Sequence, residues 1–109
     1  MNKEEIKKTI ISVLLPLQPE KVILFGSYAS GTASNDSDID IYIVSREDFL
    51  PDSYAENIRH YKKYLRPLKE LKQTIPLDVI VHTRAMNKIF ERNGSSFARE
   101  IMQTGERLI

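Results

Sequence analysis

The segment at residues 38–44, Asp-Ile-Asp-Ile-Tyr-Ile-Val, constrains this chain more than any other part of its sequence. Its strict alternation is typical of a β-strand whose isoleucines face a core, so that Asp38, Asp40 and Tyr42 share the opposite face. Two carboxylates about 5 Å apart repel each other by about 3 kcal/mol at an effective dielectric constant of about 20. A bound divalent cation would turn this repulsion into attraction, and the pair therefore predicts a metal site. The alternative is a solvated strand face without a ligand.

The remaining pattern predicts helices and strands in alternation, which is typical of an α/β or α+β fold with helices flanking a small mixed sheet. Apolar residues recur at helical spacing from residue 4 to 15, and Pro67 is expected to break a long helical stretch at 51–73. Leu108 and Ile109 are expected to add a short edge strand or simply to dock. Strands are predicted at 21–25, 38–44 and 77–82, and further helices at 84–92 and from Ser95 or Ser96 to Gly105.

Length and charge narrow the class of protein. The 109 residues are expected to form one domain, residues 1–109. The formal net charge of +1 gives no basic excess that would indicate direct binding of nucleic acid. The absence of cysteine excludes disulfides and thiolate metal sites. No apolar run approaches membrane-spanning length, and Glu4 and Glu5 come too early for a secretory signal, so we expect a cytoplasmic protein.

A glycine–serine pair follows the apolar run at 21–25 and gives a second functional signal. Backbone N–H groups at a junction between a strand and a helical turn favour anions. Gly26 would let a phosphate approach the backbone, and the hydroxyl of Ser27 can donate a hydrogen bond to a phosphate oxygen. Taken alone, such a pair is usually only a turn.

Asp78 is the third element of the constellation. It lies between Leu77 and Val79, and it therefore points away from the core face of its strand. If this strand neighbours the one at 38–44, three carboxylates converge beside the Gly-Ser turn. Phosphoryl transfer requires metal ligands and a group that activates the nucleophile. Asp38 and Asp40 suit the first task, and Asp78 suits either a second metal or a general base.

Together these motifs resemble the signature of the DNA polymerase β-like nucleotidyltransferase superfamily. The resemblance rests on Gly-Ser-Tyr-Ala-Ser-Gly at 26–31, on Ser-Asp-Ile-Asp-Ile-Tyr-Ile-Val at 37–44 and on the later Asp78 in an apolar strand. Within that superfamily the chain is most similar to the minimal nucleotidyltransferases (MNT) of bacteria and archaea. The resemblance covers nearly the whole chain, because the helices and strands come in the expected order.

This resemblance implies a reaction and a role for each residue. Gly26 and Ser27 would bind the triphosphate of ATP, and Asp38 and Asp40 would bind Mg²⁺. Asp78 would complete a two-metal site. The implied reaction is the transfer of a nucleoside monophosphate, AMP from ATP, to a hydroxyl acceptor.

The resemblance also implies a partner. MNT proteins commonly pair with small helical proteins of the HEPN class in toxin–antitoxin modules, in which the nucleotidyltransferase is the antitoxin and adenylylates its partner. A chain of this length holds little beyond a catalytic core, so its acceptor is expected to come from a partner. Association into a homodimer stays open.

One position departs from the pattern of the family. Ser30 stands where the family usually has an arginine, and Arg46, Lys62 and Arg84 are candidates to replace that cation. Two alternative functions therefore remain. The chain could be a catalytically weak antitoxin that neutralises its partner by contact, or a small-molecule nucleotidyltransferase of the aminoglycoside type, which would need an acceptor site from a dimer mate.

Other polar and aromatic side chains are interpreted as parts of the structure rather than of the active site. His60 lies in a charged stretch and is expected on a solvated helix face. His82 ends the third strand and is expected to be a hydrogen-bonded histidine at the strand end. Tyr54, Tyr61 and Tyr64 are expected to contribute to the core or to a partner interface.

Overall fold

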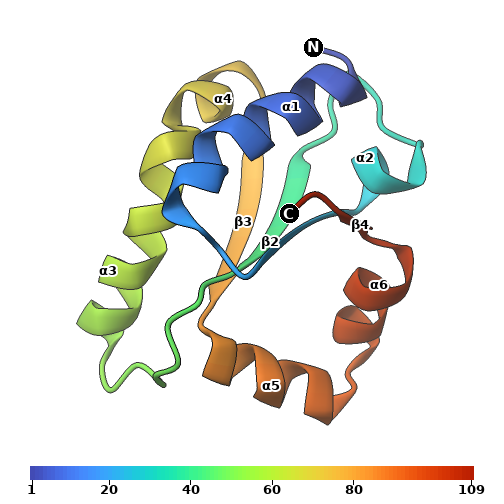
Figure 1. Ribbon diagram of the computed structural model, residues 1–109. Coiled ribbons are helices and arrows are strands. Elements are labelled where there is room, and N and C mark those ends of the chain that lie inside the picture. Colours follow the sequence, from blue (N-terminus) through green and yellow to red (C-terminus); the bar gives the residue numbers. More distant parts are fainter.

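A four-stranded mixed sheet lies at the centre of the computed structural model, which describes residues 1–109 (Figure 1). The strand order is β3-β2-β1-β4, with β1 antiparallel to both β2 and β4, and β2 parallel to β3. This confirms the predicted fold class of a small mixed sheet flanked by helices. The helices are α1 (Lys3–Leu14), α2 (Ser27–Ser30), α3 (Tyr54–Leu65), α4 (Lys69–Thr74), α5 (Arg84–Asn93) and α6 (Ser96–Thr104), with 3-10 turns η1 (Leu15–Leu17) and η2 (Arg66–Leu68), and the strands are β1 (Lys21–Phe25), β2 (Ile39–Val44), β3 (Leu77–His82) and β4 (Glu106–Arg107).

The alternation along β2 divides the core into two layers, as the sequence predicts. Ile39, Ile41 and Ile43 belong to the cluster that packs under α1, α3 and α4. Tyr42 and Val44 belong to the cluster on the other face, which α5 and α6 cover. Figure 1 shows α1, α3 and α4 grouped on one side of the sheet and α5 and α6 on the other. Asp40, between Ile39 and Ile41, therefore faces the side of α5 and α6.

Local sequence signals explain where most helices begin and end. Asn2 caps α1 in a capping box with Glu5. Pro67 interrupts the long helical stretch, since α3 ends at Leu65 and α4 begins at Lys69. The stretch begins at Tyr54 rather than at Pro51 because the side chain of Ser53 provides the N-cap.

The last residues close one edge of the sheet. The fourth strand consists of Glu106 and Arg107 rather than of Leu108 and Ile109, but both of these donate backbone hydrogen bonds to the carbonyl of Val22. Glu106 also forms ion pairs with Lys3 and Lys7 of α1. The residues at 106–109 thus join β1 to the first helix.

The expectation for His60 is wrong. Only 7% of this residue is exposed, because α3 lies across the end of β2 and places the imidazole against Ser45. The charged neighbours of His60 lie on the exposed face of α3, whereas His60 and Tyr64 share its buried face at a spacing of one turn. Tyr54, by contrast, is 81% exposed. None of the helices combines the length and the hydrophobicity that a membrane span requires.

Candidate active site

The register of β2 and β3 brings two of the candidate acids together. Asp40 and Asp78 are direct partners across these parallel strands, and neighbouring strands lie about 4.8 Å apart. Asp38 lies just before β2, at the same end of the sheet. On its other side Asp40 is paired with Phe25, the last residue of β1. The end of β1 and the beginnings of β2 and β3 therefore meet, and the Gly-Ser turn follows directly after Phe25.

Gly26 contacts the carboxylate of Asp40. Its backbone has a φ of +74°, a conformation that side-chain-bearing residues rarely adopt. A Cβ atom at this position would also overlap the carboxylate oxygen Oδ2 of Asp40. Glycine is thus required twice, for its backbone conformation and for the space that Asp40 occupies. The sequence analysis assigns Gly26 to the approach of a phosphate, and the contact with Asp40 is an additional reason for a glycine at this position.

Ser30 closes the short helix that follows. Its hydroxyl donates to the carbonyl oxygen of Ser27 over 3.2 Å and lies 2.8 Å from the hydroxyl of Thr32. The amide of Thr32 donates to the same carbonyl of Ser27 over 3.0 Å. The position at which the family usually has an arginine is therefore an exposed serine that hydrogen-bonds within its own turn.

The candidate acids carry unbalanced negative charge. Burial raises the pKa of the Asp40 carboxyl, and the charges of Asp78, Asp38 and then Glu100 raise it further. None of the ion pairs in the structure involves Asp38, Asp40 or Asp78. Glu100 extends from α6 and is a fourth acid near the site, which sequence reasoning missed because nothing in its helix relates it to the strands.

The chemistry of these donors fits a hard divalent cation, although they do not form a closed cage. No group of three or more His, Cys, Asp or Glu side chains is arranged so that it could hold a metal ion by itself. Mg²⁺ typically takes only one or two carboxylates and completes its shell with water and substrate phosphates. Asp40, with Asp38 or Asp78, offers such a partial set, because these carboxylates have no protein cation as a partner.

Two of the basic residues considered as substitutes for the missing arginine lie at the wrong end of the sheet. Arg46 follows the far end of β2, and Arg84 follows the far end of β3, where it pairs with Glu20 over 3.0 Å. Strands of this length place them about 15 Å or more from Asp40. The cation beside the Gly-Ser turn is instead Lys3, whose Nζ donates to the carbonyl of Ala29 over 3.4 Å. Sequence reasoning missed Lys3, because the contact joins the start of α1 to α2.

A hydrogen-bonded network closes the sheet face beyond the acids. The hydroxyl of Tyr42 lies 2.8 Å from Nδ1 of His82 and donates to Oδ1 of Asn87 over 2.7 Å. Burial lowers the pKa of His82, which favours the neutral ring. The ring of Phe90 packs against both Tyr42 and His82. The interpretation of His82 as a hydrogen-bonded residue at the end of its strand agrees with this arrangement. Because the network closes this part of the sheet face, a ligand would approach the acids from the end of the sheet at which they lie.

Fold and site together define a class of enzyme. A small mixed sheet with a Gly-Ser turn beside paired strand acids is the arrangement expected of nucleotidyltransferases. The sequence model of the nucleotidyltransferase domain family matches residues 4–107. The chain therefore belongs to this family.

Individual relatives narrow the comparison. The chain is similar to a Methanocaldococcus jannaschii protein named "Putative protein adenylyltransferase", with 44% identity over 52 residues, which is 45% of this chain and 52% of that protein. The similarity thus spans about half the length of this curated relative.

Solved structures share the fold. A chain in the crystal structure of a toxin–antitoxin complex with AMP-PNP matches with a TM-score of 0.57 and 24% identity, covering 94% of this chain and 72% of that one. A chain in the structure of the tri-AMPylated Shewanella oneidensis HEPN toxin in complex with MNT antitoxin matches with a TM-score of 0.55 and 19% identity, covering 98% and 71%. At such identities these likenesses establish the fold.

Proposed function

We propose that this chain is an antitoxin of the MNT type, a single domain of residues 1–109 that transfers AMP from ATP to a hydroxyl group of a small helical HEPN-type partner. One observation carries the proposal. Asp40 and Asp78 lie side by side on neighbouring strands, Asp40 contacts Gly26, and none of the candidate acids has a basic partner. The names of the relatives support the choice of a protein acceptor. We place the reaction in the cytoplasm, where ATP is available.

In this proposal each candidate residue has a separate task. Gly26 and Ser27 bind the triphosphate, and Asp38 and Asp40 hold Mg²⁺. Bound Mg²⁺ supplies positive charge to the phosphate oxygens. Asp78 lies on the edge strand with an exposed side chain, so an acceptor can reach it. Asp78 completes the two-metal site or accepts the proton of the acceptor hydroxyl.

The bonds that change follow from this assignment. The acceptor oxygen attacks the α-phosphorus of ATP, and the bond from that phosphorus to the bridging oxygen of pyrophosphate breaks. Pyrophosphate leaves, and the hydroxyl proton passes to Asp78 or to water. The protein contributes chiefly by positioning the reactants and by stabilising charge, as is general for this type of chemistry.

A second function is favoured by a specific observation at Ser30. Its hydroxyl hydrogen-bonds within its own turn, and no arginine takes its place beside the triphosphate site. An antitoxin that has lost most of its activity and neutralises its partner by contact would tolerate such a change.

A transfer assay distinguishes the two functions. Purified chain, Mg²⁺ and α-labelled ATP are incubated with the helical protein encoded beside it. We expect label on the partner, and we expect the double variant Asp38→Ala, Asp40→Ala to lose at least about a thousandfold in rate. The double variant Asp48→Ala, Asp52→Ala removes the same charge from exposed positions outside the site and is expected to retain activity. Absence of label, with a stable complex, would favour the contact antitoxin.

A further inference from the structure

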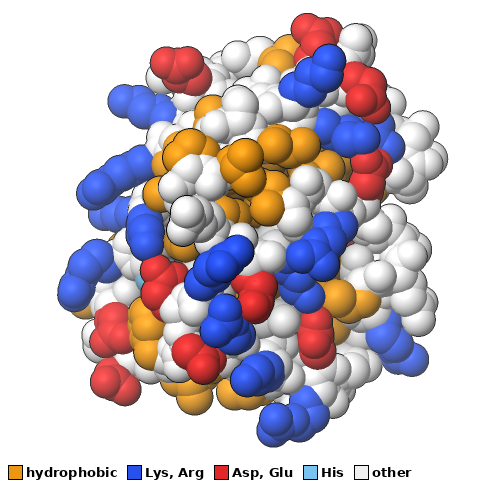
Figure 2. Space-filling view, in the orientation of Figure 1, with side chains coloured by type: hydrophobic (Ala, Val, Ile, Leu, Met, Phe, Trp, Pro, Cys, Tyr) orange, Lys and Arg blue, Asp and Glu red, His pale blue; other side chains and the backbone are white.

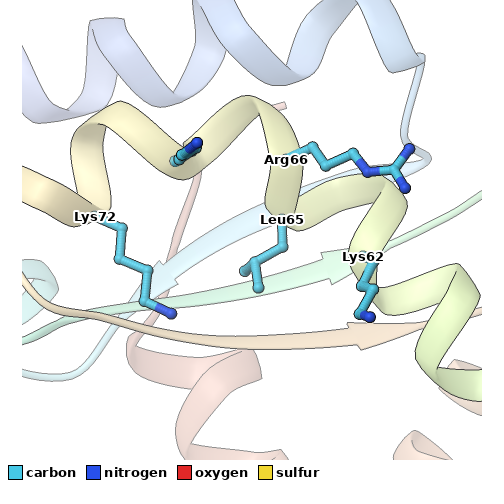
Figure 3. Close-up of a pocket in the computed structure, with 5 residues that line it drawn as sticks. Lys62, Leu65, Arg66 and Lys72 are labelled. Atoms are coloured by element: carbon cyan, nitrogen blue, oxygen red, sulfur yellow. The ribbon is translucent and has the colours of Figure 1, made fainter.

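A basic groove lies along α3 and α4, beside β3 (Figure 3). It has a volume of about 250 Å³ and is formed by α3, η2 and α4. Figure 3 shows Lys62, Leu65 and Lys72 on the side of these helices that faces β3, whereas Arg66 extends sideways. Its lining consists of four basic side chains around one leucine: Lys62, Arg66, Lys69 and Lys72 with Leu65.

The charge of this groove is not neutralised within the chain. Its four basic residues are exposed, and none of them takes part in an ion pair. Figure 2 shows Lys and Arg side chains gathered on the side of the molecule where α3 and α4 lie. The formal net charge of only +1 conceals this segregation. A concentrated patch of unpaired charge attracts a partner of opposite sign and accelerates its association.

The groove lies along the open edge of the catalytic sheet. Because the strand order is β3-β2-β1-β4, only β2 pairs with β3, and the other edge of β3 is free. Lys72 stands near the beginning of β3, because only a short connection separates α4 from Asp78. Because α3 and α4 cover the face of the sheet opposite to Asp78, a molecule held in the groove would reach the exposed Asp78 by extending round the free edge of β3.

The lining indicates the chemistry of the occupant. Leu65 and the aliphatic stems of the basic side chains give the groove an apolar floor, and the charged groups form its rim. An amphipathic helix with an apolar residue between carboxylates is complementary to such a surface. Single-stranded nucleic acid generally needs aromatic side chains on which its bases stack, and none lines the groove.

We propose that the α3–α4 groove docks an acidic helical segment of the protein acceptor and thereby brings the acceptor hydroxyl to Asp78. This inference rests on the proposed function, since it requires a protein acceptor. It adds the surface that selects this acceptor.

The test reverses charge inside and outside the groove. The groove variant is Lys69→Glu with Lys72→Glu, and the control variant is Lys8→Glu with Lys88→Glu, at exposed positions of α1 and α5 without ion pairs. In the groove variant a glutamate near the start of α4 is favourable to the helix dipole and one in its last turn is unfavourable, so these effects offset each other. Thermal unfolding verifies that both variants fold.

The first readout is the transfer rate as a function of acceptor concentration. We expect the groove variant to raise the KM for the acceptor at least about tenfold, with kcat and the KM for ATP within about twofold of wild type. The control variant should leave all three unchanged. An unchanged KM for the acceptor in the groove variant, or an equal rise in both variants, overturns the proposal.

The second readout does not require catalysis. Fluorescence anisotropy measures binding of a labelled acidic amphipathic peptide of about 18 residues and of an oligouridylate of similar charge, in the background Asp38→Ala, Asp40→Ala. We expect salt-sensitive peptide binding that the groove variant loses. Tighter binding of the oligouridylate, or peptide binding that survives in the groove variant, overturns the proposal. Peptide binding in this background, together with no transfer by the wild-type chain in the first assay, would instead contradict the proposed function and retain the groove.

Discussion

The carboxylates at the two ends of the sheet have opposite electrostatic environments. At the candidate site, burial and neighbouring acids raise the pKa of Asp40, which has no basic partner. At the far end, Glu47 accepts a hydrogen bond from Lys63 over 2.8 Å and lies 3.5 Å from Nε2 of His60. Burial alone would raise the pKa of Glu47, but the hydrogen bonds from Lys63 and Ser45 and the charge of Lys63 lower it to about 2.

This difference separates stability from function. The same two strands connect both ends, but Glu47 at the far end has basic partners, whereas Asp40 at the acid end has none. Such an unpaired charge destabilises the folded protein, and a bound cation would compensate it. The far end is arranged for stability, and the acid end is arranged to bind.

The largest effect on stability is expected from filling the space between Gly26 and Asp40. The substitution Gly26→Ala places a Cβ atom onto the carboxylate of Asp40 and adds strain from the positive φ. We expect a loss of about 2–3 kcal/mol in the free energy of unfolding and about a hundredfold in transfer rate. Denaturant titration and the transfer assay measure these two effects.

Gly94 provides the matched control. Its φ is +59°, but nothing lies within 4 Å of the Cβ that an alanine would add. Gly94→Ala should therefore show only the backbone penalty, about 1 kcal/mol, with normal activity. Equal losses of activity in both variants would mean that contact of the added methyl group with Asp40 is not the cause of the loss.

Removal of the charge of Glu47 should lower the free energy of unfolding of the protein. Its folded-state pKa of about 2 lies below the ordinary 4.5, so its charge stabilises the protein above pH 4.5 and this stabilisation disappears as the pH falls towards 2. Because the side chain is 33% exposed, solvent screening reduces the effect to about 1–2 kcal/mol. Glu47→Gln should lower the free energy of unfolding by this amount at pH 7 and by progressively less in acid. A difference that stays constant down to pH 2 would contradict this account.

The smallest effect on stability is expected at Asp40, with the opposite sign. Its folded-state pKa is raised, so its ionised form destabilises the protein at neutral pH, and this cost is relieved as the pH falls through that pKa. Asp40→Asn should therefore raise the free energy of unfolding at pH 7 by under about 1 kcal/mol and abolish transfer. The gain should shrink in acid. Added Mg²⁺ should raise the melting temperature of the wild type but not that of this variant, and an equal rise in both would argue against Asp40 as a ligand.

Much of the fold could be predicted because local rules decide it. Alternation in β2 assigned Ile39 and Asp40 to opposite faces, and the ring of Pro67 broke the long helix where expected. Asp78 was placed on the face of Asp40 by its phase alone. The pairing of Asp40 with Asp78, however, was conditional on β2 and β3 being neighbours, which only the topology determines.

The errors arose where contacts between distant segments decide the outcome. His60 was misread because charged neighbours suggested solvent, whereas Ser45 from the end of β2 meets its ring. Arg84 is a candidate for the missing cation on sequence grounds. Its position in the sequence does not reveal that it lies at the opposite end of the sheet from Asp40. The contact of Gly26 with Asp40 depends on the antiparallel pairing of β1 with β2, which no local pattern reveals.

The junction of β1 with residues 106–109 has a consequence for the order of folding. During synthesis β1 emerges early, but its outer edge stays unpaired until the segment at 106–109 has been made. Until then the backbone groups of β1 are open to pairing with another chain. The ion pairs of Glu106 with Lys3 and Lys7 form just as late, because they span nearly the whole sequence. Final docking of α1 should therefore be a late step in folding.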